Sequence, residues 1–125
     1  MSLHDEIRQI GERAVEAARE LARLTAKKKN AMIEAMADEL DARRGEILAA
    51  NRQDMEEGRA AGLSAALLDR LALDDQRLEA MARALRAVTA LKDPVGTRMS
   101  RWIRPNGLVI QKVRVPIGVI AIIYE

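Results

Sequence analysis

Few side chains in this sequence could carry out chemistry. The chain contains no Cys, so it offers no thiolate nucleophile, no disulfide and no zinc-thiolate site. Its one His is His4, beside the start of the chain, where we expect a solvated residue rather than a ligand or a base. A single terminal His cannot complete a Cys–His or Ser–His pair. G-x-G-x-x-G and P-loop patterns are absent as well. We therefore predict that no catalytic residue lies in these 125 residues.

Two clusters of like charge could bind a ligand. Lys27–Lys29 fall in the first turn of a predicted helix, where cations oppose the helix dipole. Such a conflict can mark the docking place of an anion or an acidic partner, but an exposed turn also explains it and is the interpretation we favour. Asp54, Glu56 and Glu57 have helix-surface spacing, which favours a solvated face over a metal site. We expect no metal.

Composition argues against several classes of partner. Basic and acidic residues are interspersed and the net charge is +2, which is weak support for a nucleic-acid partner. Trp102 and Tyr124 are the only aromatic residues, so the chain has no platform for stacked bases. The longest apolar run is shorter than the roughly 20 residues that a membrane-spanning helix needs. No targeting segment opens the chain, so we expect a cytoplasmic protein with no nucleic-acid or membrane partner.

The stretch that organises the chain is its last one. Val115–Tyr124 carries no charge and is rich in Val and Ile, which predicts a strand buried on both faces of a parallel sheet. Pro116 lacks an N–H group, so the ladder should begin at about Val119. A buried helix is the weaker alternative, because β-branched residues dominate and Gly118 interrupts the run. A parallel neighbour needs a crossover, and no such strand precedes this one. We expect the front part of a larger α/β protein.

Helices should fill most of the chain before that strand. An apolar stripe predicts a helix over residues 3–24, and Thr25, Ser64 and either Asp74 or Asp75 are the expected N-caps of later helices. The side chains expected to be buried follow helical spacing. They are Ile7, Ile10, Ala14, Ala17, Ala18, Leu21 and Leu24 in the first helix, Met32, Ile33, Met36, Ala37 and Leu40 in the second, and Leu78, Met81, Ala82, Leu85, Val88 and Leu91 in the last. Gly62 is the expected C′ residue of the helix that ends near Ala60.

A β-hairpin should join the helices to the final strand. Residues 98–115 alternate in type around Pro105-Asn106-Gly107, and Asn-Gly supplies the positive φ values of a tight turn. A lone hairpin is marginal in water, so it must lie against something else. The predicted organisation is residues 1–97 helical, 98–115 a hairpin arm and 116–125 the buried strand. Two functions stay open on the residues alone: the first portion of an α/β enzyme, or a stand-alone helical interaction module with a hairpin arm.

Several blocks of the sequence form a recognisable series from about Thr25 onward. They are Leu48-Ala49-Ala50-Asn51 with Asp54, Gly62-Leu63-Ser64, Leu67–Leu71, Asp93–Gly96, Arg104–Leu108, Val113–Ile120 and Ile122–Glu125. These blocks, in this order, resemble those of γ-glutamyl phosphate reductases, which belong to the aldehyde dehydrogenase superfamily. The resemblance implies an α/β, aldehyde-dehydrogenase-like fold, of which this chain holds the N-terminal helices, an oligomerisation-type hairpin and the first strand of a parallel nucleotide-binding sheet.

The resemblance also implies a function. The family reduces γ-glutamyl phosphate with NADPH to glutamate 5-semialdehyde and phosphate in proline biosynthesis, by way of a thioester on a Cys. This chain holds no such Cys, so by itself it should be inactive and should bind no cofactor. Ile123, Tyr124 and Glu125 would lie at the carboxyl end of the first strand, where ligands bind in such sheets, and are the expected cofactor-binding residues. The complete protein is expected to be a homo-oligomer, assembled through the 98–115 hairpin.

Overall fold

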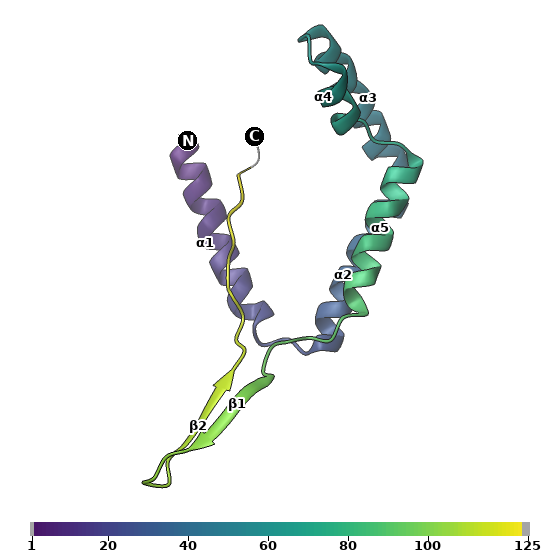
Figure 1. Ribbon diagram of the computed structural model, residues 1–125. Helices are drawn as coiled ribbons and strands as arrows, with labels where there is room; N and C mark the ends of the chain where they lie inside the picture. The colour runs from purple at the N-terminus through teal and green to yellow at the C-terminus, as the bar shows by residue number, and fades with distance from the viewer. Residues whose placement is uncertain (1, 124–125) are drawn as a thin grey trace. The chain divides into compact units, whose positions relative to one another are not determined.

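The computed structural model describes residues 2–123, which form five helices and two strands (Figure 1). The elements are α1 (Leu3–Leu21), α2 (Ala26–Ala42), α3 (Arg44–Ala60), α4 (Ala65–Leu71), α5 (Asp75–Thr89), β1 (Arg98–Ile103) and β2 (Val109–Val113). They belong to two compact units. Unit 1 contains Met1–Lys29 and Lys92–Glu125, and unit 2 contains Asn30–Leu91. The coarse prediction of helices followed by a two-stranded antiparallel hairpin is confirmed.

The predicted helix starts are confirmed at their caps. The Thr25 hydroxyl accepts a hydrogen bond from the Lys28 N–H at 3.3 Å, and the Ser64 hydroxyl accepts one from the Leu67 N–H at 3.3 Å. Of the two candidates before α5, Asp74 is the cap, and its carboxylate accepts the Arg77 N–H at 2.7 Å. Each cap satisfies a donor that the first turn of a helix leaves without an intrahelical partner.

The end of α3 is fixed by two glycines. Gly62 has φ +76°, as expected for a C′ residue, and its N–H donates to the Arg59 carbonyl at 3.1 Å. The Leu63 N–H reaches back to the Gly58 carbonyl at 3.0 Å, which completes a Schellman motif. A Cβ atom on Gly58 would lie only 3.0 Å from a Leu63 methyl and 3.3 Å from a Leu68 methyl. The absence of a side chain at Gly58 therefore lets α4 pack against α3.

The core of unit 2 is small. Among the described residues, Ala37, Leu78 and Ala82 are the buried apolar side chains. The buried stripes predicted for α2 and α5 are therefore wrong in part, because Met32 and Met36 are 48% and 57% exposed. Met81, Val88 and Leu91 of the predicted stripe are exposed too. Helical spacing placed these side chains on common faces, but each face needs a second layer of protein to be buried.

Unit 1 combines α1, the hairpin and the C-terminal run. No side chain of α1 is buried, and Ile7 and Ile10 of its predicted buried stripe are more than half exposed. The run after β2 passes beside α1 (Figure 1). Val15, Ala18 and Ala22 line shallow clefts together with residues 116–119. This contact covers only part of the apolar surface of either segment.

The hairpin is confirmed, with a turn that differs from the expected one. Only Gly107 has a positive φ, +84°, whereas Asn106 does not. The Gly107 N–H donates to the Arg104 carbonyl, and the Arg104 N–H donates to the Leu108 carbonyl, both at 2.9 Å. This pattern matches a three-residue loop closed by a left-handed glycine rather than a two-residue Asn-Gly turn. Along the ladder, Met99 is an extra residue on β1 between the pairs Arg98–Val113 and Ser100–Lys112.

The predicted buried strand differs most from the structure. Residues 114–123 form no strand with any described residue, and Ile117, Ile120 and Ile122 are 87%, 64% and 65% exposed. The physical reason is that a strand makes its backbone hydrogen bonds with a neighbour, and both described strands pair with each other in the hairpin. The buried strand at residues 116–125 stays a prediction, and Tyr124 and Glu125 lie outside the described residues.

Two glycines of α3 provide a test of the α3–α4 contact. We expect Gly45→Ala, where nothing lies within 4 Å of the new methyl group, to raise the free energy of unfolding by up to ~1 kcal/mol. Gly58→Ala should gain the same helix propensity but crowd Leu63 and Leu68, so it should be less stable than Gly45→Ala by about 1–3 kcal/mol. Urea unfolding followed by circular dichroism measures both variants. An equal gain from both would mean that α4 does not pack on Gly58.

Candidate functional site

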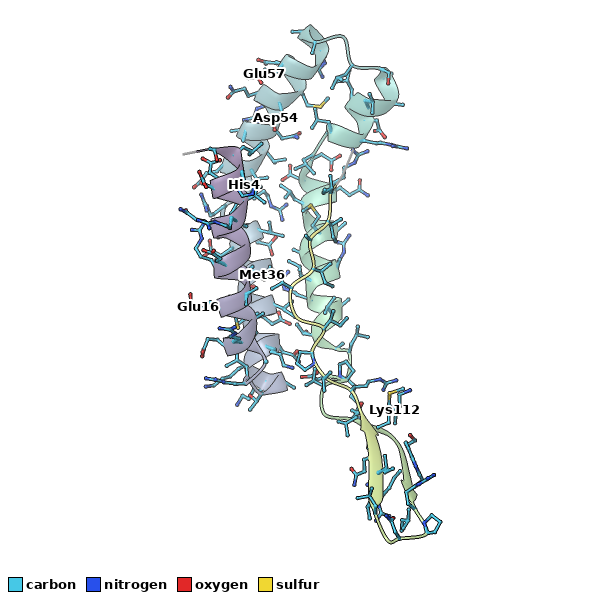
Figure 2. All side chains as sticks on the ribbon, turned by 90° about the vertical axis from the view of Figure 1, so that its left-hand side faces the viewer. His4, Glu16, Met36, Asp54, Glu57 and Lys112 are labelled. Atoms are coloured by element: carbon cyan, nitrogen blue, oxygen red, sulfur yellow. The ribbon has the colours of Figure 1, made fainter. Side chains whose placement is uncertain are left out.

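The structure brings no cofactor site together at the predicted residues. Ile123 is 90% exposed and lies in no described strand, and Tyr124 and Glu125 fall outside residues 2–123. Ile123 can offer only an apolar side chain and its backbone groups. No group of three or more His, Cys, Asp or Glu side chains that could hold a metal occurs in the described part of the chain. Asp54 and Glu57 lie on α3, and His4 lies on α1 (Figure 2). His4, Asp54, Glu56 and Glu57 are all exposed.

The Lys27–Lys29 cluster is divided by the fold. Lys29 forms an ion pair with Asp93, and both side chains are about three-quarters buried. The pKa of Asp93 lies below its ordinary value, first because Lys29 donates to the carboxylate and then because the Val95 N–H does. Lys27 and Lys28 are exposed. The ion pair ties the start of α2 to the segment before the hairpin, so one of the three cations has a structural partner.

The strongest polar cluster in unit 2 joins three helices. Arg86 of α5 contacts Glu34, Asp38 and Asp41 of α2, the last two at 2.7 and 3.1 Å. Arg44 at the start of α3 contacts Asp41 at 3.0 Å and Asp75 of α5 at 3.3 Å. The Arg44 guanidinium, and after it that of Arg86, holds the pKa of Asp41 below its ordinary value. All six of these side chains take part in ion pairs of the cluster, which links α2, α3 and α5.

A buried amide fixes the connection between α4 and α5. Asn51 on α3 is 7% exposed. Its Nδ2 donates to the Leu71 carbonyl at 2.9 Å, and its Oδ1 accepts the Leu73 N–H at 2.7 Å. Both the Nδ2 and the Oδ1 atoms of Asn51 are therefore hydrogen-bonded, so its burial leaves neither atom without a partner. The sequence placed Asn51 in a helical segment and in a block of family resemblance, but nothing in the helical pattern indicates which loop an amide will bind.

One uncovered apolar surface of unit 2 is a groove along α2. Its apolar lining comes from Met32, Met36, Leu40, Ile47 and Leu85, and we call it the α2 groove. It consists of two adjoining depressions of ≈ 540 Å³ and ≈ 510 Å³ that share Met36, Glu39 and Leu40. Its edge carries Glu39 and the ion pair of Arg43 with Glu46 at 2.8 Å. Its lining is mostly apolar and has no set of polar groups pointing at a common centre, as a small-molecule site would have. The groove is therefore better suited to contact with another protein surface.

The hairpin is more basic than the sequence as a whole suggests. Residues 94–123 contain no Asp or Glu, and their charged residues are Arg98, Arg101, Arg104, Lys112 and Arg114. Exposed apolar side chains, Trp102 and Ile103 among them, lie between these cations. Lys112 on β2 is labelled in Figure 2. The expectation that charges are interspersed is therefore wrong for this segment. Counting the charged residues of this segment, rather than those of the whole chain, would have shown its excess of positive charge.

The two units share one property: each leaves apolar surface uncovered. Unit 2 is a thin helical layer, and unit 1 carries a basic two-stranded arm and an uncovered apolar run. Within residues 2–123 no cluster of His, Cys, Asp or Glu could hold a metal. Both units present surfaces suited to packing against further protein. No helix in the described part of the chain is long and apolar enough to cross a membrane.

Comparison with known proteins identifies what the chain is similar to. It is 54% identical over all 125 residues to the γ-glutamyl phosphate reductase of Moorella thermoacetica and 50% identical over 125 residues to that of Heliobacterium modesticaldum. The chain spans about 30% of the length of these relatives and corresponds to their N-terminal portion. No family model matches the sequence.

Solved structures agree with the sequence relatives. The γ-glutamyl phosphate reductase of Thermotoga maritima superposes with a TM-score of 0.80 at 46% identity, over 84% of this chain and 25% of that protein. The Saccharomyces cerevisiae enzyme of the same name gives a TM-score of 0.80 at 28% identity, over 86% of this chain and 28% of that protein. The resemblance seen in the sequence blocks is thus confirmed: the chain matches the N-terminal portion of γ-glutamyl phosphate reductases, which are oxidoreductases.

The Arg86–Asp41–Arg44 cluster makes unit 2 sensitive to acid. A carboxylate whose pKa is lowered on folding stabilises the folded state above its unfolded pKa, near 3.8, and that contribution is lost as the pH falls through the folded pKa. We therefore expect the stability difference between the parent chain and Asp41→Asn to be constant near neutral pH and to shrink below about pH 4. Urea unfolding at a series of pH values measures it.

The control removes the main cause of the lowered pKa. In an Arg44→Gln background, the Asp41→Asn substitution should produce a smaller acid-dependent difference, because the first hydrogen bond to the Asp41 carboxylate is gone. A difference that keeps its full pH dependence without Arg44 would contradict the assignment.

Proposed function

We propose that this chain is the N-terminal portion of an NADPH-dependent reductase that converts γ-glutamyl phosphate to glutamate 5-semialdehyde and phosphate in proline biosynthesis. The observation that carries the proposal is the 54% identity to a γ-glutamyl phosphate reductase over every residue of the chain. The similarity of fold to the Thermotoga maritima protein of that name, at a TM-score of 0.80, also supports it. A cytoplasmic location stays a prediction.

The chemistry of the proposed reaction must come from outside these residues. NADPH would supply a hydride when bound, and the thiolate that accepts the acyl group would come from a Cys that this sequence lacks. Of the three residues expected to contact the cofactor, the structure describes only Ile123, whose exposed side chain is apolar. We therefore assign no reaction step to residues 1–125, and cofactor contacts by Ile123, Tyr124 and Glu125 belong to the proposal only.

The proposed role of the chain is structural. In this proposal residues 1–97 are the helical part of an aldehyde-dehydrogenase-like nucleotide-binding domain, and residues 116–125 are the first strand of its sheet. The exposed Ile and Val side chains of residues 117–123 support this, because their burial would remove a large apolar surface from water. The contact of residues 116–119 with α1 supports the idea that α1 covers one face of that strand.

Residues 98–115 are proposed to be an arm that joins subunits into a homo-oligomer. The hairpin has two strands only, and a two-stranded sheet is marginal in water without further packing. Val109, Val113 and Trp102 are 43%, 43% and 45% exposed, on an arm whose charges are all positive. A partner surface that is apolar and acidic would match it. The alternative function, a stand-alone helical interaction module, is favoured only by the uncovered α2 groove.

A chimaera tests the reductase proposal directly. We expect the Moorella thermoacetica enzyme to keep activity when its segment matching this chain is replaced by residues 1–125, because 54% of the residues are the same. The assay is run in reverse, as phosphate-dependent reduction of NADP⁺ by glutamate 5-semialdehyde. Residues 1–125 alone should show no turnover.

The unmodified Moorella thermoacetica enzyme is the positive control. A folded chimaera without turnover, or turnover by residues 1–125 alone, would contradict the proposal. A folded, inactive chimaera that binds another macromolecule through its helices would favour the interaction module.

The hairpin arm has its own test in the same chimaera. We expect Ile110→Glu together with Val113→Glu to shift the protein to smaller species in sedimentation velocity, because charges replace apolar contacts on both faces of the arm. Gln111→Glu introduces the same side chain at a polar position between them and should leave the mass unchanged. An unchanged mass in the double variant would count against a subunit contact at this arm.

A further inference from the structure

We propose that Lys29 is a positioning residue for the hairpin arm: its ion pair with Asp93 fixes the base from which residues 98–115 extend. The inference rests on the proposed function of that arm. It also gives a role to the Asp93–Gly96 block, which the proposed reaction leaves without one. The residues that form this base all belong to unit 1.

Unit 1 is built from two separate stretches of the chain. The first stretch ends at Lys29 and the second begins at Lys92, so the chain leaves the unit and returns to it at neighbouring points. Figure 1 shows the segment before β1 passing beside the connection between α1 and α2. The ion pair of Lys29 with Asp93 joins the stretch that contains α1 to the stretch that contains the arm.

The position of Lys29 is unfavourable unless its side chain has a partner. Lys29 lies in the first turn of α2, where a cation opposes the helix dipole, and both it and Asp93 are about three-quarters buried. Removal of either partner would leave a largely buried charge unpaired. Lys29 holds the pKa of the Asp93 carboxyl below its ordinary value, so the pair stays charged at neutral pH. Lys28, in the same turn, is exposed instead.

Asp93 connects this anchor to the hairpin without a flexible linker. Its carboxylate accepts the Val95 N–H at 3.0 Å, which folds the chain into a turn. The Gly96 N–H donates to the Arg114 carbonyl at 2.9 Å, and the Arg114 N–H donates to the Thr97 carbonyl at 3.0 Å. These bonds extend the pairing of β1 with β2 back to the turn at Asp93. Loss of the anchor should therefore loosen the base of the arm.

A separate set of bonds closes unit 2 beside this ion pair. The Asn30 Nδ2 donates to the Thr89 carbonyl at 2.9 Å, and the Thr89 hydroxyl donates to Glu34 at 2.7 Å. Asn30 and Thr89 lie at the two ends of unit 2. Because these bonds do not involve Lys29 or Asp93, unit 2 should keep its ends together when the ion pair is removed.

Amide hydrogen exchange in the chimaera with the Moorella thermoacetica remainder tests the anchor. Lys29→Met replaces the ammonium by an uncharged side chain of similar length. We expect exchange at the Val95 and Gly96 N–H groups to become about tenfold faster, because their hydrogen bonds form the base of the arm. The Leu73 N–H, which is hydrogen-bonded within unit 2, should exchange at the parent rate. Lys28→Met is the matched control and should leave all three rates unchanged.

Two results of this measurement would overturn the proposal. Unchanged exchange at Val95 and Gly96 in Lys29→Met would mean that the ion pair does not hold the base of the arm. An equal increase at Leu73 would mean that Lys29 supports the stability of the whole chain rather than the position of the arm.

A double-mutant cycle shows whether Lys29 acts through Asp93. Asp93→Asn removes the negative charge, while the amide oxygen can still accept the Val95 N–H. We expect Asp93→Asn to speed exchange at Gly96 on its own, and the double variant with Lys29→Met to be no faster than the faster single variant. Effects that multiply in the double variant would mean that the two residues act separately, and would contradict the proposal.

Subunit association measures whether the arm depends on its base. Lys29→Met should raise the concentration at which the chimaera dissociates by about tenfold in a sedimentation dilution series, whereas Lys28→Met should not. Association at the parent level, in a variant whose arm base exchanges faster, would overturn the positioning role.

The proposed function and this inference fail in different ways. A folded chimaera without turnover, in which Lys29→Met still loosens the base of the arm, removes only the assignment of the reaction. An active chimaera whose exchange at Val95 and Gly96 ignores Lys29→Met removes only the role of the ion pair. If Ile110→Glu with Val113→Glu leaves the mass unchanged, the arm makes no subunit contact, and the exchange rates alone decide the role of Lys29.

Discussion

The structure depends on one constraint: a β-strand cannot form its backbone hydrogen bonds within itself and needs a neighbouring strand. The run from Val119 to Ile123 has the composition of an interior strand, yet both described strands are already paired with each other in the hairpin. Its Ile side chains are therefore exposed, and residues 116–119 share shallow clefts with α1 without being buried there. A sheet supplied by further protein would bury the side chains and pair the backbone together. The hairpin and the α2 groove also lack a surface that covers them. Similarity to only the N-terminal portion of longer enzymes accounts for all three uncovered surfaces: the apolar run, the hairpin and the groove.

Unit 2 is held together chiefly by polar and local interactions. Its buried apolar side chains are few, whereas Arg86 and Arg44 connect α2, α3 and α5, and Asn51 holds the α4–α5 connection against α3. Exposed ion pairs contribute little each, although a cluster that shares partners contributes more than its members alone. This arrangement defines the positions of the helices while leaving their outer apolar face open. It suits a segment that is completed by packing against a larger body.

The sequence predicted what is decided locally. Thr25 and Ser64 were found as caps, and the third cap was narrowed to Asp74 or Asp75, because the hydrogen bonds of a cap lie within three residues. The exposure of Met36 and Ile10 was missed, because periodicity shows which residues share a face but not what covers that face. The turn was placed correctly but assigned the wrong type, since Asn-Gly occurs both in two-residue hairpin turns and in three-residue loops closed by the glycine. The cofactor contacts expected at Ile123, Tyr124 and Glu125 followed from family resemblance alone and depend on strands that the described residues do not contain.

The central claim is that residues 119–123 become an interior strand when the rest of the reductase is present. Amide hydrogen exchange of Val119–Ile123 tests it most directly, with residues 1–125 alone compared with the chimaera that carries the Moorella thermoacetica remainder. The account predicts rapid exchange in the short chain and exchange slowed by several orders of magnitude in the chimaera, as for the core strands of a stable domain. Equally fast exchange in a folded, active chimaera would contradict it.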